Sequence, residues 1–188
     1  MMKWIPVAMA LLLSACSSTP QKTYYQLPAL GVSAPVSTVS TGTATRQLWL
    51  EHVSVADYLA QNGVVYQTND VQYVIAQNNL WASPLDQQLQ QTLVTNLSSA
   101  LPGWVVSSLP MSSEQDVLNV TISGFHGRFD GKAIIRGEWV LNHQGKLTKR
   151  PFSLELKQGE DGYDALVRTL AQGWQQEAQA IASQAGSF

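Results

Sequence analysis

The only cysteine of the chain, Cys16, restricts the fold more than any other residue. A chain with a single thiol cannot form an intramolecular disulfide, so a hydrophobic core has to hold the fold together. Cys16 also follows an apolar run at residues 4–13, and the amino terminus and Lys3 precede that run. A positively charged start and an apolar run too short to span a bilayer are typical of a secretory signal.

The residues around Cys16 predict a lipid anchor. Ser14 and Ala15 form a small pair directly before the thiol, which is the lipobox pattern of bacterial lipoproteins. We expect cleavage between Ala15 and Cys16, a diacylglycerol on the sulfur and an acyl chain on the new amine. Each buried methylene adds about 0.8 kcal/mol, so three chains make the attachment permanent. Ser17 replaces the aspartate typical of inner-membrane lipoproteins, and this favours the outer membrane, facing the periplasm. The alternative is an ordinary signal peptide in which Cys16 is incidental.

Length and charge limit the classes of function. Removal of residues 1–15 leaves 173 of the 188 residues, enough for one domain with its own core. Lys3 is lost with them, so ten basic residues stand against 13 acidic ones, a formal charge of −3. A mildly acidic chain without a basic cluster argues against nucleic acid and against electrostatic binding to anionic lipid headgroups.

Two segments follow the signal: a lipidated tether at 16–23 and a single α+β domain at 24–188. Residues 29–45 carry no charge and are mostly Ser, Thr, Ala, Val, Gly and Pro, which predicts a flexible loop within the domain. Residues 24–27 have the pattern of a short strand. If this strand pairs into the sheet, the tether has about seven residues and spans at most about 25 Å. If it does not pair, the flexible tether extends to Arg46. We favour the paired strand.

The rest of the domain alternates between extended and helical patterns. One helical turn is expected at 57–63, and the turns between strands at Asn69-Asp70, Asp130-Gly131 and 143–145. The predicted strands are 48–55, with an irregularity near His52, 64–68, 71–76, 104–106, 117–129, 132–142 and 146–157.

Two amphipathic helices complete the prediction. The first begins with Ser83 as cap and Pro84 at its first position, and carries leucines every four residues. The second runs from 161 to about 183, and Gly173 within it indicates close packing. The expected fold is α+β, a mainly antiparallel sheet with both helices packed on one face. The helix stripes are Leu85, Leu89, Leu93, Leu97 and Leu101, then Tyr163, Val167, Leu170, Trp174, Ala178 and Ile181.

The sequence lacks the motifs of a catalytic or metal site. There is no glycine-rich phosphate loop followed by lysine and no Gly-x-Ser-x-Gly elbow. His52, His126 and His143 stand apart without cysteine partners or the helical spacing of metal ligands, and surface or satisfied polar roles fit them better. We therefore predict a protein that is no enzyme and binds no metal or cofactor beyond the acyl chains on Cys16.

The chain resembles the ABC-type transport auxiliary lipoprotein family over essentially its whole mature length. The residues that carry the resemblance are Tyr24-Tyr25-Gln26-Leu27, Val64-Val65-Tyr66, Val71-Gln72-Tyr73, Leu80-Trp81-Ala82-Ser83-Pro84-Leu85, Asp130-Gly131, Gly137-Glu138-Trp139 and Asp161-Gly162-Tyr163. The resemblance implies two partners, a polytopic inner-membrane protein and a membrane-anchored MCE-domain protein that forms a lipid-carrying tube across the periplasm. The lipoprotein would dock that tube at the outer membrane and support envelope integrity.

The sequence leaves the function, the oligomeric state and the partner contacts open. The alternatives to a docking role are a stand-alone outer-membrane assembly or structural lipoprotein and a direct periplasmic lipid carrier with its own apolar pocket. Whether the chain forms a homo-oligomer is equally open. The candidate partner contacts are Tyr58, Tyr66, Asn78 and Trp81, on the 58–66 segment and a loop at 78–81. The competing interpretation makes Trp81, Trp104, Trp139 and Trp174 core aromatics.

Overall fold

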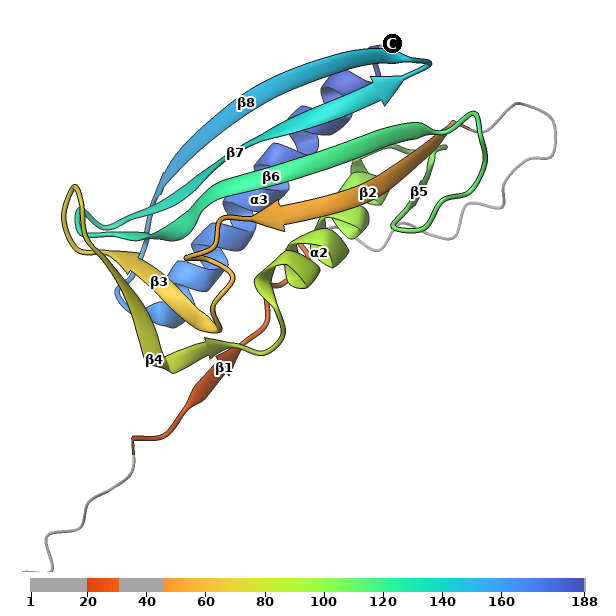
Figure 1. The fold of residues 1–188 in the computed structure, drawn as a ribbon. Helices are drawn as coiled ribbons and strands as arrows, with labels where there is room; N and C mark the ends of the chain where they lie inside the picture. The colour runs from red at the N-terminus through yellow and green to blue at the C-terminus, as the bar shows by residue number, and fades with distance from the viewer. Residues whose placement is uncertain (1–19, 31–45, 188) are drawn as a thin grey trace, which may run out of the picture.

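The computed structural model describes residues 20–30 and 46–187, which form one eight-stranded sheet with two helices (Figure 1). Both helices lie against the same face of the sheet, as the sequence predicts. Neither of them, within the described ranges, is long and apolar enough to cross a membrane. The elements are β1 (Thr23–Tyr25), β2 (Gln47–Val55), β3 (Gly63–Gln67), β4 (Tyr73–Trp81), α2 (Leu85–Ala100), β5 (Val105–Ser107), β6 (Asp116–Arg128), β7 (Lys132–His143), β8 (Lys146–Lys157) and α3 (Tyr163–Ala185).

The α+β class is confirmed, but the sheet is mixed rather than mainly antiparallel. Four of its strand pairs are parallel, namely β1 with β4, β2 with β5, β2 with β6 and β3 with β6. Only the β3–β4 hairpin and the β6–β7–β8 meander are antiparallel. The long strand β6 pairs with β2 along its first part and with β3 at its end. Alternating polar and apolar residues fix which face is buried but carry no strand direction, so the sequence pattern missed these crossovers.

Strand β1 pairs with β4, which supports the short-tether geometry. Its register is Thr23 against Asn79 and Tyr25 against Trp81, in parallel. The chain after β1 is fixed to α2, because the Leu27 N–H donates to the Gln88 side-chain oxygen at 2.7 Å. Residues 31–45 lie outside the described part of the chain, and so do Ala15, Cys16 and Ser17.

Several local expectations are confirmed and two need correction. Strand β2 has its irregularity between Leu50 and His52, as predicted. Ser83 does not cap α2, because Pro84 occupies the N-cap position and no side chain caps the helix. The predicted loop at 78–81 is the last part of strand β4, which reaches Trp81 because β1 pairs along it.

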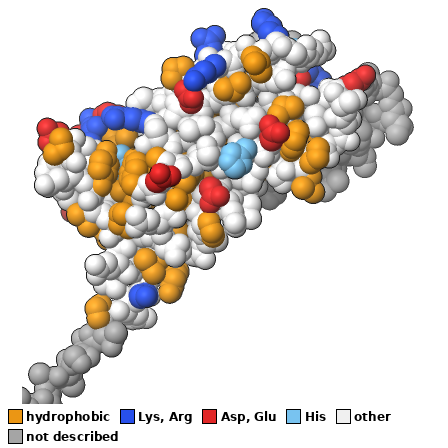
Figure 2. Space-filling model, in the orientation of Figure 1, with side chains coloured by type: hydrophobic (Ala, Val, Ile, Leu, Met, Phe, Trp, Pro, Cys, Tyr) orange, Lys and Arg blue, Asp and Glu red, His pale blue; other side chains and the backbone are white. Residues whose placement is uncertain are grey.

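The core lies between the helices and the sheet. Both predicted helix stripes are buried there, apart from the half-buried Tyr163. Gly173 lets α3 approach the sheet, since a Cβ at this position would lie 2.3 Å from Ile135 Cδ1. The Trp174 indole N–H donates to the Leu89 carbonyl at 3.2 Å and so joins the two helices. Figure 2 shows hydrophobic side chains over the left end of the visible face and a second group toward its right end.

Candidate functional site

A polar groove of about 840 Å³ opens at one end of the sheet. It lies where β2 and β6 begin and β7 ends, at the opposite end of the molecule from the chain that leads into β1 (Figure 1). Its walls are Arg46, Gln47, the loop 112–115, the first residues of β6 and the β7–β8 turn. We call this feature the polar groove.

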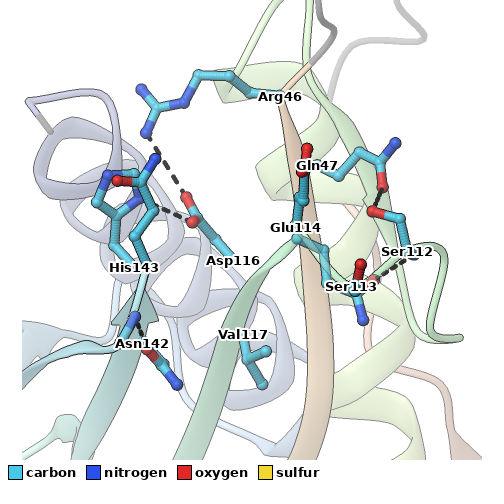
Figure 3. Close-up of a pocket in the computed structure, with 12 residues that line it drawn as sticks. Arg46, Gln47, Ser112, Ser113, Glu114, Asp116, Val117, Asn142 and His143 are labelled. Atoms are coloured by element: carbon cyan, nitrogen blue, oxygen red, sulfur yellow. Dashed lines mark hydrogen bonds and ion pairs between the residues drawn. The ribbon is translucent and has the colours of Figure 1, made fainter.

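The buried carboxylate of Asp116 organises one wall of the groove. Asp116 is the first residue of β6 and is 6% exposed. Its Oδ1 lies 2.7 Å from Nδ1 of His143 and its Oδ2 lies 3.6 Å from a terminal nitrogen of Arg46 (Figure 3). Because an ionised carboxylate only accepts hydrogen bonds, His143 donates from Nδ1. The Arg46 guanidinium also stacks over Trp104 at 4.0 Å, a cation–π contact that fixes its position.

The other wall is a loop that its own side chains hold in place. The Gln115 side-chain oxygen accepts from the Met111 backbone N–H at 2.7 Å. The Ser112 hydroxyl donates to the Gln47 side-chain oxygen, also at 2.7 Å, and so ties the loop to β2 (Figure 3). Ser112 therefore directs its proton to Gln47 rather than to His143, and a nucleophile–base contact is not formed here.

The groove presents polar groups that can recognise a partner. No group of three or more potential metal ligands occurs among the residues that the structure describes. What the groove offers is a fixed carboxylate, a guanidinium, an imidazole and several amide and hydroxyl groups. Such groups bind polar or charged segments of a partner through hydrogen bonds.

The four candidate contacts from the sequence do not lie together. Trp81 is 4% exposed and packs against Phe125 in the core. Tyr66 is half-buried on β3, where its ring contacts the backbone of Gly127 closely enough to exclude a Cβ there. Asn78 is half-buried on β4. A role of these residues in partner contact stays a prediction.

Tyr58 is half-buried in the segment between β2 and β3 and packs against the edge of the core. Its hydroxyl donates to the Ser123 carbonyl at 2.8 Å, and its ring contacts that of Tyr73 at 5.1 Å. Burial raises the pKa of Tyr58 to about 12, so the phenol stays protonated at neutral pH.

The core interpretation of the tryptophans holds for most of them. Trp81, Trp139 and Trp174 are buried, whereas Trp104 is half-buried under Arg46. Of the histidines, His52 is exposed and His126 is buried, with Nδ1 3.0 Å from the Gly127 carbonyl. Both fit the predicted surface or satisfied polar roles.

Sequence reasoning missed the cluster of Arg46, Asp116 and His143. The three residues are separated by 70 and 27 positions, and only the parallel pairing of β2 with β6 and the β6–β7 hairpin bring them together. One signal was present, since Asp116 is a charged residue at the start of a strand with alternating apolar residues. A carboxylate there has to be exposed or paired with cations.

Comparison with known proteins gives the family. Residues 25–182 match the ABC-type transport auxiliary lipoprotein component. The chain belongs to that family. The auxiliary lipoproteins most similar to it include the intermembrane transport lipoprotein PqiC of Escherichia coli K12 and that of Shigella flexneri. Each is 60% identical over 185 residues, or 98% of this chain and 97% of the relative.

Solved structures agree with this membership. A crystal structure of an uncharacterized protein shares 63% sequence identity with the chain, with a TM-score of 0.78 over 87% of this chain and 98% of that one. A Xanthomonas campestris protein has the same fold at 16% identity, with a TM-score of 0.67 over 88% of this chain and 99% of that one. The resemblance seen in the sequence is therefore confirmed, and the family is a transport component rather than a class of enzymes.

Proposed function

We propose that this auxiliary lipoprotein is the outer-membrane component of an intermembrane lipid transport system. In this proposal it docks an MCE-domain tube that spans the periplasm, whose inner-membrane end belongs to a polytopic protein, and it thereby supports envelope integrity. The observation that carries the proposal is the placement of the polar groove. The groove lies at the end of the sheet remote from β1, the first strand after Cys16 in the sequence.

The lipid anchor determines which end of the body faces the membrane. Cleavage after Ala15 and acylation of Cys16 would leave about seven residues before β1, with a reach of at most about 25 Å. Because β1 pairs with β4, the folded body begins there and is held near the membrane. The polar groove then points away from the lipid, into the periplasm, where a tube from the inner membrane arrives.

The chemistry of the groove supports a protein partner. Asp116 holds Arg46 and His143 in fixed positions, so a partner segment meets preorganised charges rather than mobile side chains. Preorganised polar groups cost less ordering entropy on binding and give specificity.

The two rival functions make different predictions. A direct lipid carrier needs an enclosed apolar pocket, but the groove described here is open and lined mainly by polar residues. A stand-alone structural lipoprotein needs no inner-membrane partner. Lipid bound to the body in native mass spectra would favour the carrier, and an anchored chain that captures no protein would favour the structural role.

Co-purification from native envelopes tests the proposal. The lipidated chain is expected to capture an MCE-domain tube protein. The Asp116→Ala variant is expected to capture less of it, because Arg46 and His143 lose the carboxylate that positions them. The matched control is Glu114→Gln, an exposed change in the same groove that leaves this cluster intact. Recovery of the chain without any tube-forming protein would refute the docking role.

A further inference from the structure

Exposed apolar side chains gather on two neighbouring turns at the end opposite the polar groove. Val71 is 76% exposed, Phe129 55%, Val74 51% and Tyr73 44%. Val71 lies in the β3–β4 turn, Tyr73 and Val74 are the first two residues of β4, and Phe129 lies in the β6–β7 turn. The turns are adjacent because Gln67 pairs with Arg128 in the parallel β3–β6 register. We call these four residues the apolar tip, and Figure 2 shows hydrophobic side chains over this end.

The apolar tip is built rigidly. The Asn69 side-chain oxygen accepts from the backbone N–H groups of Val71 and Gln72 at 3.0 and 2.9 Å. The Thr68 N–H donates to the Gln72 carbonyl at 2.9 Å, which closes the turn. These bonds fix the backbone of the turn, so Val71 is presented to the surroundings at little further entropic cost on binding.

Aromatic rings support the tip from behind. The Tyr73 ring meets the buried His126 edge-on, with the ring centroids 5.1 Å apart, and the centroid of the Tyr58 ring also lies 5.1 Å from that of Tyr73. The exposed part of Tyr73 is therefore one edge of a packed cluster of rings. Amphipathic rings of this kind suit the boundary between water and lipid.

The charges beside the tip are held in local ion pairs. Arg128 pairs with Asp130 and Glu155 at 2.7 and 2.8 Å, and Lys132 pairs with the same two carboxylates. Arg136 also pairs with Glu155, at 3.3 Å. Because these cations already have protein partners, the attraction of the tip to a membrane has to come mainly from its apolar side chains.

The direction of the chain indicates what covers the tip. Because β1 runs parallel to the last residues of β4, the chain enters β1 from the side on which β4 begins, and β4 begins at the β3–β4 turn. Figure 1 shows β1 below the two turns, and both β1 and the turns lie away from the end that carries the polar groove. A tether of about 25 Å at most keeps the anchoring leaflet within reach of the tip.

We propose that the apolar tip rests in the headgroup region of the leaflet that carries the acyl chains. The proposal depends on the lipid anchor of the proposed function. Two contacts, the anchor and the tip, then fix the orientation of the body and aim the polar groove away from the bilayer.

Depth-dependent fluorescence quenching tests this contact. The lipidated chain is placed in vesicles of phosphatidylethanolamine and phosphatidylglycerol that contain brominated lipid. An environment-sensitive fluorophore is attached to one introduced thiol in Val71→Cys or Phe129→Cys. Cys16 is the only native cysteine and is acylated in this form, so each introduced thiol is the single reactive one. The matched controls are Leu109→Cys and Leu147→Cys, which are 71% and 69% exposed and lie outside the tip.

The expected result is a blue shift and quenching by brominated lipid at positions 71 and 129 only. Equal quenching at all four positions, or none at any of them while the chain still floats with the vesicles, would overturn the tip contact and leave the proposed function standing. A chain that fails to float would overturn both, since the anchor itself would be missing. A blue shift at positions 71 and 129 that grows with the amount of protein per vesicle, and is not quenched by brominated lipid, would mean that a second copy of the chain covers the tip. That result would overturn the proposal.

Discussion

The two ends of the sheet present different surfaces, one polar and one apolar. At the groove end a buried carboxylate, Asp116, is shared by His143 and Arg46 and lines an open polar surface. At the tip end the ion pairs around Arg128 are exposed, and the most prominent side chains are apolar. In the proposed function, the polar end binds a protein partner and the apolar end contacts lipid. The predictions below test that division of roles, starting with the largest expected effect.

Loss of the anchor is expected to have the largest effect. A Cys16→Ala chain, secreted with a cleavable signal that carries no lipobox, has no acyl chains and is expected to leave the membrane completely. Membrane fractionation measures the release, and an envelope-stress assay measures the loss of protection. The matched control is the same secreted chain with Cys16 and its lipobox restored. Full protection by the released form would show that neither end needs a membrane.

Loss of the carboxylate shared by His143 and Arg46 is expected to have the second largest effect, a loss of stability at the groove end. Asp116→Ala removes the acceptor of His143 and the counterion of Arg46, at a cost of about 1–3 kcal/mol in the free energy of unfolding. Urea denaturation measures this cost. Glu114→Gln, exposed in the same groove, is the control and is expected to leave the unfolding midpoint unchanged. A midpoint for Asp116→Ala equal to that of the control would contradict the structural role of the cluster.

Two buried titratable groups are expected to shift stability in opposite directions with pH. Burial lowers the pKa of His126 behind the tip, so its contribution is complete above about pH 6.5 and is lost as the pH falls below that value. Burial raises the pKa of Glu177 in the C-terminal half of α3, so its contribution is complete below about pH 4.5 and is lost as the pH rises.

Glutamine at each position separates the two effects. Glu177→Gln keeps an acceptor for the Trp139 indole N–H, 3.2 Å away, and is expected to raise the melting temperature at pH 7 and remove the decline above pH 4.5. His126→Gln is expected to remove the decline below pH 6.5. Thermal unfolding across this pH range measures both. Parallel curves for the wild-type chain and either variant would mean that the group does not titrate differently in the folded state.

The exposed ion pairs at the tip end are expected to matter least. Arg128 and Lys132 lower the pKa of Glu155 to about 2, so its stabilising contribution is present above about pH 4.5 and is lost as the pH falls toward 2. At pH 7, Glu155→Gln is expected to shift the unfolding midpoint less than Asp116→Ala does, because solvent and salt screen exposed pairs. A larger shift than that of Asp116→Ala would reverse the energetic ranking of the two ends.

Local patterns predicted most of the elements. The leucine repeat located α2, the turn pairs located the hairpins, and Gly173 indicated the close approach of α3. These features depend on neighbours within a few positions, where residue spacing and turn chemistry act directly. Pro84 taking the N-cap in place of Ser83 shows the limit at helix ends, where one residue changes the assignment.

The order of the strands in the sheet and the residues of the groove could not be predicted from local patterns. The parallel pairing of β2 with β6 depends on crossovers, and it alone brings Arg46 near Asp116. The apolar tip has the same origin, since Val71 and Phe129 become neighbours only through the short β3–β6 pairing. Residue pairs so distant in sequence leave no periodic signal. A single sequence therefore predicts individual helices and strands better than the contacts between them.

Photo-crosslinking from both ends in native envelopes tests the proposed orientation of the body between the outer membrane and its partner. A diazirine side chain is placed at Val71 in one lipidated chain and at Glu114 in another, and the adducts are identified by mass spectrometry. We expect lipid adducts from position 71 and adducts with an MCE-domain protein from position 114. Capture of the protein partner at position 71 with lipid at position 114 would contradict the proposed orientation.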